Sequence, residues 1–180
     1  MPKTVRANKD RQVFVTWKDV LKVIDVEPNI EWKAIIALAR LTGARVPSEL
    51  YGLTWNDINF ETRQITIRSP KTEHHGESHA SRICPLFVEL LPYLESLFAF
   101  VQPEIKKSVS PQVFALVTGP RKNLATAFSR MVKKAGLEPW PKLFTNMRSS
   151  RETELQKEFS PADVCNWFGH SPIIAAQFYA

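Results

Sequence analysis

The chain has 180 residues, a hydrophobic content of 44% and a formal net charge of +6 at pH 7. This length allows one sizeable core, and no apolar run reaches the roughly 18 residues that span a bilayer. The N-terminus lacks a signal peptide's apolar stretch, so we expect a soluble, cytoplasmic protein without a membrane partner. Two cysteines, Cys84 and Cys165, exclude a disulfide framework and indicate buried free thiols. The positive charge favours a polyanionic partner.

Capping signals predict three helices after a polar, basic arm at residues 1–12. Thr16 can accept a hydrogen bond in the first turn of a helix, and Gly43 suits the left-handed turn after one. Pro47 fits the first turn of a short third helix. The predicted helices span about residues 17–26, 30–41 and 47–53.

The hydrophobic period then changes from helical to alternating, which predicts strands. The predicted strands span residues 55–59, 64–68 and 82–86, with a polar stretch at 69–81 before the last. Helical patterns return, with Ser160 as a capping residue and Pro161 in a first turn. These helices are predicted at about 92–101, 123–135, 145–158 and 161–168, with a short final helix after Ser171. The sequence thus predicts an α+β, mainly helical domain over residues 13–180 with a small three-stranded antiparallel sheet.

The segment 41–50, followed by Trp55 and Asp57, resembles the first catalytic block of the tyrosine recombinases, the phage integrase family. In that family an arginine follows a helix-ending glycine, and an acidic residue four positions later helps to hold it. By this resemblance Arg45 is a catalytic guanidinium that can contact a phosphate with two hydrogen bonds, and Glu49 supports it. An ordinary surface pair of Arg45 and Glu49 is the alternative.

The strand 65–68 and its return at 82–86 resemble the family's hairpin that carries a catalytic lysine. The resemblance implies that Lys71 protonates the departing 5′ oxygen of the DNA, while a solvated loop lysine is the alternative. His74, His75 and His79 lie in the same loop. Without carboxylate or cysteine ligands at useful spacing they do not predict a metal site, and no cofactor is expected.

Residues 143–148 resemble the family's His-x-Leu-Arg block, with threonine at the histidine position. Arg148 is by this resemblance the second phosphate-binding arginine. Thr145 can cap the helix and donate a hydrogen bond to phosphate, but it cannot carry a proton near neutral pH as an imidazole can. Asn146 or a histidine of the 74–79 loop could substitute in part. Arg151 could contact DNA, pair with Glu154 or lie solvated on the helix surface.

The end of the chain resembles the family's closing block, with residues 167–171 followed by Tyr179. The resemblance implies that His170 donates a hydrogen bond to the scissile phosphate and that Tyr179 attacks it, forming a 3′-phosphotyrosyl link. Taken singly, His170 could equally cap a helix and Tyr179 could pack a terminal helix. Four such blocks occur in the family's order between positions 41 and 180.

The resemblance implies a site-specific DNA recombinase, or integrase, of a mobile element that needs neither metal nor ATP and acts at the prokaryotic nucleoid. Double-stranded DNA is the expected partner, with a tetramer on paired sites at full length and a monomer for this fragment. A type IB topoisomerase-like relaxing enzyme and a catalytically weakened DNA-binding module are the alternatives. We expect the family's N-terminal DNA-clamp domain and C-terminal tail to be absent. The candidate DNA contacts, expected to bind phosphates or to be solvated charges rather than to read bases, are Arg121, Lys122, Arg130, Lys133, Lys134 and Arg151.

Overall fold

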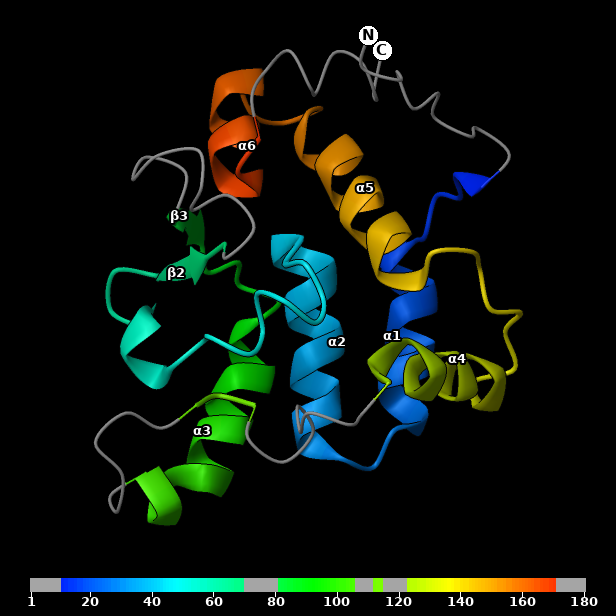
Figure 1. Cartoon of the computed structure of the whole chain (residues 1–180), viewed down its shortest axis with the longest axis horizontal. Helices are drawn as coiled ribbons and strands as arrows, with labels where there is room; N and C mark the ends of the chain where they lie inside the picture. Colours follow the sequence, from blue (N-terminus) through cyan, green and yellow to red (C-terminus); the bar gives the residue numbers. More distant parts are fainter. Residues whose placement is uncertain (1–10, 70–80, 106–111, 115–122, 171–180) are drawn as a thin grey trace, which may run out of the picture.

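The computed structural model of the chain describes residues 11–69, 81–105, 112–114 and 123–170. Within these ranges the chain forms six helices. A small sheet lies at one side of the domain (Figure 1). None of these helices is long and apolar enough to cross a bilayer. The helices are α1 (Trp17–Val26), α2 (Ile30–Thr42), α3 (Leu91–Ile105), α4 (Leu124–Lys134), α5 (Leu143–Leu155) and α6 (Pro161–Phe168). The predicted α+β, mainly helical class is confirmed.

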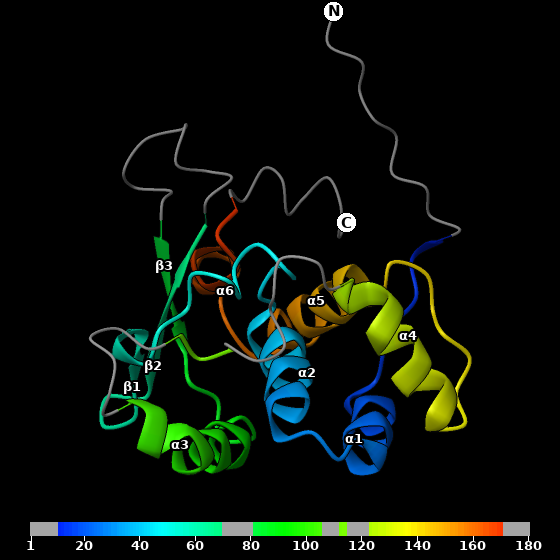
Figure 2. The ribbon, with the colours of Figure 1, turned by 60° about the horizontal axis from the view of Figure 1, so that its bottom comes forward.

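Helix α2 forms the centre of the domain. Eleven of its 13 side chains are buried, and these include the polar side chains of Glu31, Arg40 and Thr42. It packs against α1, α3 and α5. Both ribbon views place α1, α4 and α5 on one side of α2 and place α3 with the sheet on the other (Figures 1 and 2). The C-terminal end of α2 therefore lies between the two halves of the fold.

The sheet consists of three antiparallel strands in the order β1–β2–β3. They are β1 (Ile58–Asn59), β2 (Gln64–Arg68) and β3 (Ser81–Pro85). In β2 the inward side chains are Ile65 and Ile67, and Ile67 pairs with Arg82 across the ladder. In β3 the inward positions belong to Arg82 and Cys84. An arginine thus occupies a core-facing position of a half-buried strand, where apolar residues are the rule.

The predicted capping signals hold at several helix ends. Thr16 accepts from the Asp19 N–H at 3.1 Å, and Ser160 accepts from the Asp163 N–H at 3.2 Å. Gly43 ends α2 at a φ of 64°. A Cβ at Gly43 would lie 2.4 Å from Cε1 of Phe168, so this glycine is required both for the left-handed turn and for the close approach of α6.

Two predicted elements are wrong. Residues 47–53 form turns after a cis Val46–Pro47 bond, because their backbone bonds mix two spacings, such as Glu49 N to Arg45 O and Leu50 N to Pro47 O. The predicted strand at 55–59 begins instead as a 3₁₀ turn, Trp55–Asp57. Asp57 accepts from both the N–H and the hydroxyl of Thr54, which turns the chain before β1.

Helix α5 begins two residues earlier than predicted, and Thr145 does not cap it. The capping position is Lys142, which has a left-handed backbone with φ of 46° and gives no side-chain cap. Thr145 lies in the first turn of the helix and is exposed. The cysteine prediction is confirmed, since both thiols are free and buried. Burial raises the pKa of Cys84 to about 12.

Candidate active site

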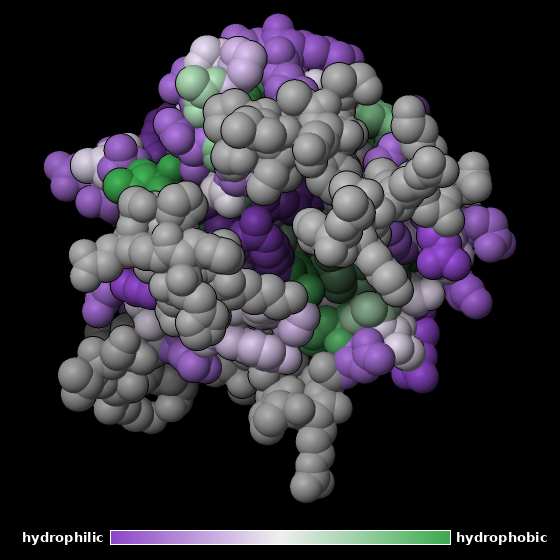
Figure 3. Space-filling view, turned by 45° about the horizontal axis from the view of Figure 1, so that its top comes forward, coloured by the Kyte–Doolittle hydropathy of each residue, from purple (hydrophilic) through white to green (hydrophobic). Residues whose placement is uncertain are grey.

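A cleft of about 540 Å³ lies between the turn that follows α2 and the start of α5. Two basic side chains from opposite ends of the sequence, Arg45 and Arg148, line it together with Thr145. The remaining lining is mostly apolar and comes from Ala44, Val46, Pro47, Ser48 and Phe144. The space-filling view contains a hollow of this mixed character, hydrophilic beside hydrophobic, near its centre (Figure 3). The two predicted arginine blocks therefore meet at one concave surface.

Arg45 is held at the cleft by a carboxylate. Its backbone N–H donates to Glu49 Oε2 at 2.7 Å, and its Nη1 donates to Glu49 Oε1 at 2.7 Å. Nη1 also lies 3.3 Å from the Ser69 hydroxyl. The Arg45 side chain remains 31% exposed, and its Nε and Nη2 make no hydrogen bond within the described residues. The predicted support by Glu49 is thus present, and part of the guanidinium faces the cleft.

Behind Glu49 lies a second arginine that the sequence analysis did not assign a role. Arg82 Nη1 and Nη2 donate to the two Glu49 oxygens, each at 2.8 Å, and Nε donates to the Trp167 carbonyl at 2.7 Å. Burial alone raises the pKa of Glu49, but the hydrogen bond and charge of Arg82, with further bonds from Arg45 and Ser69, lower it to about 2. Glu49 is therefore a fixed anion between two cations.

Arg148 is held by backbone carbonyls instead of a carboxylate. Its Nη1 donates to the Gly43 carbonyl and its Nη2 donates to the Phe168 carbonyl at 2.5 Å. The guanidinium carbon lies 4.9 Å from the centre of the Phe168 ring. Burial lowers the pKa of Arg148 to about 10, and the neighbouring charges of Arg45 and Arg82 act in the same direction. Arg148 therefore remains a cation at neutral pH and ties α5 to the ends of α2 and α6.

His170 lies directly beside Arg148. Its backbone N–H donates to the Cys165 carbonyl at 3.2 Å just after Gly169, which is the C-cap of α6. Its side chain nevertheless faces the site, with Nδ1 3.5 Å from Arg148 Nη2. The other ring nitrogen, Nε2, lies 2.6 Å from Glu152 Oε1. The described structure thus joins three of the predicted catalytic residues, Arg45, Arg148 and His170, in one place.

Several predicted positions lie outside the described residues: Lys71, Tyr179, Arg121, Lys122 and the loop histidines His74, His75 and His79. Of the other predicted DNA contacts, Arg130, Lys133 and Lys134 are exposed on α4.

Arg151 takes one of the places considered for it, and Asn146 does not take the place considered for it. Arg151 is not solvated, because its Nε donates to the Leu41 carbonyl and its guanidinium lies 4.4 Å from the centre of the Phe87 ring. It also makes the predicted pair with Glu154, at 3.4 Å. Asn146 is buried and its amide donates to the carbonyls of Arg11 and Pro141, so it does not replace the missing histidine.

Three residues of the site were missed: Ser69, Arg82 and Glu152. Arg82 carried a usable signal, since it alternates with Cys84 on the inward face of a strand, and a charge at such a position needs a buried partner. Glu152 follows Arg148 by four residues, which places both on one face of α5. Ser69 lies directly after β2 and carried no comparable signal. Among the described residues, no group of three or more His, Cys, Asp or Glu side chains could hold a metal ion.

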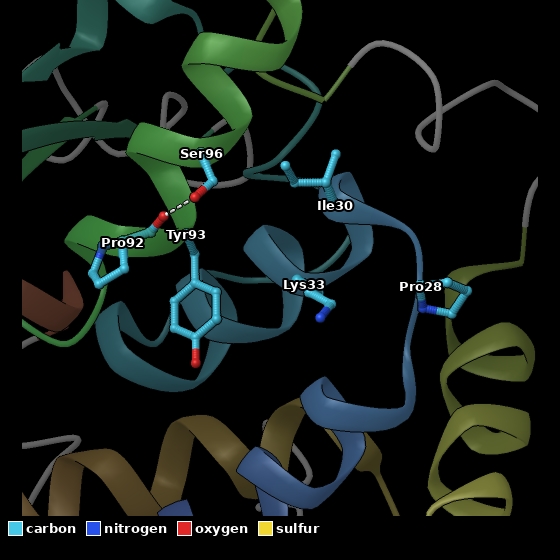
Figure 4. Close-up of a pocket in the computed structure, with 6 residues that line it drawn as sticks. All are labelled: Pro28, Ile30, Lys33, Pro92, Tyr93 and Ser96. Carbon is cyan, nitrogen blue, oxygen red and sulfur yellow. Dashed lines mark hydrogen bonds between the residues drawn. The ribbon is translucent and has the colours of Figure 1, made fainter.

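A second pocket lies at the opposite end of α2, about 20 Å along the helix. Figure 4 shows the residues that line it: Pro28, Ile30, Lys33, Pro92, Tyr93 and Ser96. The lining offers one cation, and burial raises the pKa of the Tyr93 hydroxyl, with the charge of Asp25 adding to the shift. An anion would therefore meet far less positive charge here than at the cleft of Arg45 and Arg148.

The model of the phage integrase family matches residues 14–180. A putative integrase/recombinase of Haemophilus influenzae is 28% identical over 156 residues, covering 85% of this chain and 39% of that protein.

Solved structures show the same fold. The XerA recombinase superposes with a TM-score of 0.74 at 20% identity, covering 93% of this chain and 59% of its own. A lambda integrase tetramer bound to a Holliday junction superposes with a TM-score of 0.68 at 20% identity. The match covers 94% of this chain and 48% of the lambda integrase chain. The Tn1549 transposon integrase with a circular intermediate DNA superposes with a TM-score of 0.71 at 21% identity. The match covers 94% of this chain and 61% of the transposon integrase chain. The chain thus spans about two fifths to three fifths of the length of these relatives. With its family match over residues 14–180, it belongs to the phage integrase family.

Proposed function

We propose that this chain is the catalytic part of a site-specific DNA recombinase, an integrase that cleaves and rejoins DNA through a 3′-phosphotyrosyl intermediate. The observation that carries the proposal is the convergence of Arg45 and Arg148 on one cleft. Each guanidinium is fixed by the protein before any ligand binds. Preorganised cations of this kind stabilise the charge that develops on a phosphoryl group in the transition state.

The proposed reaction uses one tyrosine and one leaving oxygen. The Tyr179 hydroxyl gives its proton to solvent water and its oxygen forms a bond to phosphorus, while the bond from phosphorus to the 5′ oxygen breaks. Lys71 supplies the proton that the departing 5′ oxygen takes up. Since the free pKa of a tyrosine is about 10, nearby cations ease its deprotonation. The phosphotyrosyl link conserves the energy of the broken bond and the guanidinium groups supply the positive charge, so the reaction calls for neither ATP nor metal.

The proposed partner is double-stranded DNA. The lambda integrase relative is a tetramer on a Holliday junction, and the Tn1549 integrase is bound to transposon DNA. By analogy we propose a tetramer on paired sites for the complete recombinase of a mobile element, acting on DNA in the cytoplasm. Residues 13–180 would form the catalytic domain and residues 1–12 a basic arm.

A specific observation favours a second candidate, a catalytically weakened DNA-binding module. Thr145 is exposed on the cleft wall where the family places an imidazole, and the hydroxyl cannot carry a proton near neutral pH. Thr145→His would restore that imidazole at an exposed position, where it meets no burial cost. If the chain is weakened by Thr145, we expect this variant to raise the cleavage rate about 10-fold or more, as general acid–base groups do.

Covalent trapping separates the two candidates. The chain would be incubated with nicked duplexes of randomised core sequence, and covalent protein–DNA adducts would be counted on denaturing gels. We expect an adduct from the wild-type chain and none from Tyr179→Phe. Binding without adduct would support the second candidate, and an adduct that persists in Tyr179→Phe would overturn the proposed nucleophile. If adducts form but only supercoils are relaxed, a topoisomerase-like activity replaces recombination.

A further inference from the structure

One buried acid, Glu152, has no place in the proposed reaction. Resting on the proposed function, we propose that Glu152 is a positioning residue that holds the His170 imidazole against Arg148. The carboxylate, the imidazole and the guanidinium would then act as one unit at the phosphate cleft. Glu152 would touch neither the DNA nor the reacting atoms, and its effect would pass through His170.

The placement of Glu152 points to this role. Its side chain is fully buried, with 0% exposure, and His170 is nearly so at 9%. Glu152 Oε1 lies 2.6 Å from His170 Nε2. Glu152 also lies one helical turn after Arg148 on α5, so the two charges share one face of the helix. A single helix therefore carries both the phosphate-binding cation and the anion that contacts its neighbouring imidazole.

The burial of this carboxylate is costly unless nearby groups compensate it. Removing a carboxylate from water costs several kcal/mol, and good hydrogen bonds or opposite charges must offset that cost. Neither oxygen of Glu152 makes a regular hydrogen bond with a described residue. Its compensation comes from the adjacent imidazole and from the Arg148 guanidinium, with which it interacts electrostatically. If this position served stability alone, an apolar side chain would fill it without the free-energy cost of burying a carboxylate.

Two described neighbours of the imidazole favour one proton arrangement. Nε2 faces a carboxylate, which only accepts hydrogen bonds, so Nε2 carries a hydrogen. Nδ1 faces Arg148 Nη2, which only donates, so Nδ1 offers its lone pair at 3.5 Å. Carboxylates that contact one ring nitrogen fix the tautomer and the orientation of the other in many metal sites. Glu152 would do the same here with a guanidinium in place of the metal.

This arrangement would set the direction of Arg148. Its two Nη groups already donate to the carbonyls of Gly43 and Phe168, and the imidazole adds a contact at Nη2. His170 is the one histidine among the described residues, and Thr145 holds no imidazole. By holding the His170 ring, Glu152 would therefore keep an imidazole next to Arg148 in the described site.

The test combines a spectroscopic and a kinetic readout on the 180-residue chain. The four histidines would be labelled with ¹⁵N, and His170→Asn would assign its signals. We expect the Nε2–H tautomer in all three proteins, because Arg148 can only donate to Nδ1. The Nε2 proton should exchange slowly with water in the wild type and in Glu152→Gln, whose amide oxygen can still face it, and quickly in Glu152→Ala. Glu158→Gln, which removes an exposed carboxylate just after α5, is the matched control and should change nothing.

Adduct formation then tests the role. We expect Glu152→Ala to slow adduct formation about 10-fold in the wild-type background and to cost nothing further in His170→Ala, while Glu152→Gln restores most of the rate. Slow exchange of the Nε2 proton in Glu152→Ala, or a full additive loss in the double variant, would overturn the proposal. If Glu152→Ala fails to fold, Glu152→Gln with a changed tautomer would overturn it as well. Absence of any wild-type adduct would defeat the proposed function, whereas the exchange rate of the Nε2 proton would still decide the Glu152–His170 pair.

Discussion

Arg45 and Arg148 face the same cleft but are held in opposite ways. Arg45 donates a hydrogen bond to Glu49, a buried carboxylate that also accepts hydrogen bonds from both Nη groups of Arg82. Arg148 has no carboxylate within hydrogen-bond distance among the described residues, and it rests on the carbonyls of Gly43 and Phe168. The first arrangement concentrates charge in one cluster, and the second uses the ends of two helices.

This difference separates the functions of the two arginines. Because the C-terminal end of a helix carries partial negative charge, the carbonyls near the ends of α2 and α6 suit a cation. Arg148 therefore connects α2, α5 and α6 while it faces the cleft. Arg45 keeps part of its guanidinium free, and its support comes from behind. Changes at Arg45 should act mainly on chemistry, and changes at Arg148 should act on chemistry and stability together.

Among the variants that test this comparison, Glu49→Gln should cause the largest loss of folding stability. The variant leaves Arg82 as a buried cation without its partner, and breaking a buried pair in this way costs about 3–5 kcal/mol. Urea denaturation followed by circular dichroism would measure the loss. Glu89→Gln, at an exposed position, is the control and should stay within about 0.5 kcal/mol of the wild type. A loss below about 1 kcal/mol for Glu49→Gln would show that the cluster is not a stabilising unit.

The same carboxylate predicts a dependence of stability on pH. The pKa of Glu49 falls from 4.5 to about 2 on folding, so the unfolded chain binds more protons between these values. Its contribution is complete above about pH 4.5 and is lost as the pH falls toward 2. The full shift corresponds to about 3 kcal/mol. Unfolding free energies of wild type and Glu49→Gln should converge toward pH 2, and a constant difference from pH 7 to 2 would contradict the assignment.

The sequence predicted most of the fold because its local signals are strong. Thr16, Gly43 and Ser160 mark helix ends through capping chemistry that depends on neighbouring residues only. The turn at 47–53 was missed because Glu49 binds Arg45 and Arg82 instead of completing a helix face. The start of α5 was predicted two residues too late because Lys142, which precedes the helix with a left-handed backbone, gives no side-chain capping signal.

Of the site, Arg45 with its supporting Glu49 and Arg148 followed from sequence blocks, whereas the partners distant in the sequence did not. Arg82 and Glu49 are 33 residues apart, and Glu152 meets His170 only because α6 turns back on α5. Such pairings depend on tertiary packing that no local pattern encodes. The assignments of Lys71 and Tyr179 remain predictions, since both lie outside the described residues.

Lysine substitutions at the two arginines test the comparison directly. Lysine keeps the charge but cannot make two parallel hydrogen bonds to a phosphate. We expect Arg45→Lys to slow adduct formation about 100-fold, within the range for removing one transition-state donor, while DNA binding changes less than about 3-fold. Equal losses of binding and cleavage would argue against a transition-state role for Arg45.

Arg148→Lys should slow adduct formation to a similar degree but should also lower stability by about 2 kcal/mol. A lysine cannot donate to both the Gly43 and the Phe168 carbonyls from the same position, and an unsatisfied buried carbonyl costs about 1–3 kcal/mol. Urea denaturation of the two lysine variants side by side gives the measurement. Equal stabilities would remove the distinction between a carboxylate-held and a carbonyl-held arginine.

Ser69→Ala should have the smallest effect. This variant tests how much the Ser69 hydroxyl contributes to holding Glu49 and Arg45 in place. The Ser69 hydroxyl donates to Glu49 Oε1 at 2.6 Å and lies 3.3 Å from the Nη1 atoms of both Arg45 and Arg82. Losing one such hydrogen bond costs about 1 kcal/mol, and Glu49 keeps its arginine partners. Ser96→Ala, where an exposed hydroxyl donates to the Pro92 carbonyl at 2.6 Å, is the matched control. Since Ser69 contacts Arg45 but lies away from the Arg148 carbonyls, adduct formation should fall a few-fold in Ser69→Ala and stay unchanged in the control. A loss as large as that of Arg45→Lys would mean that the hydroxyl, and not the carboxylate, fixes the arginine.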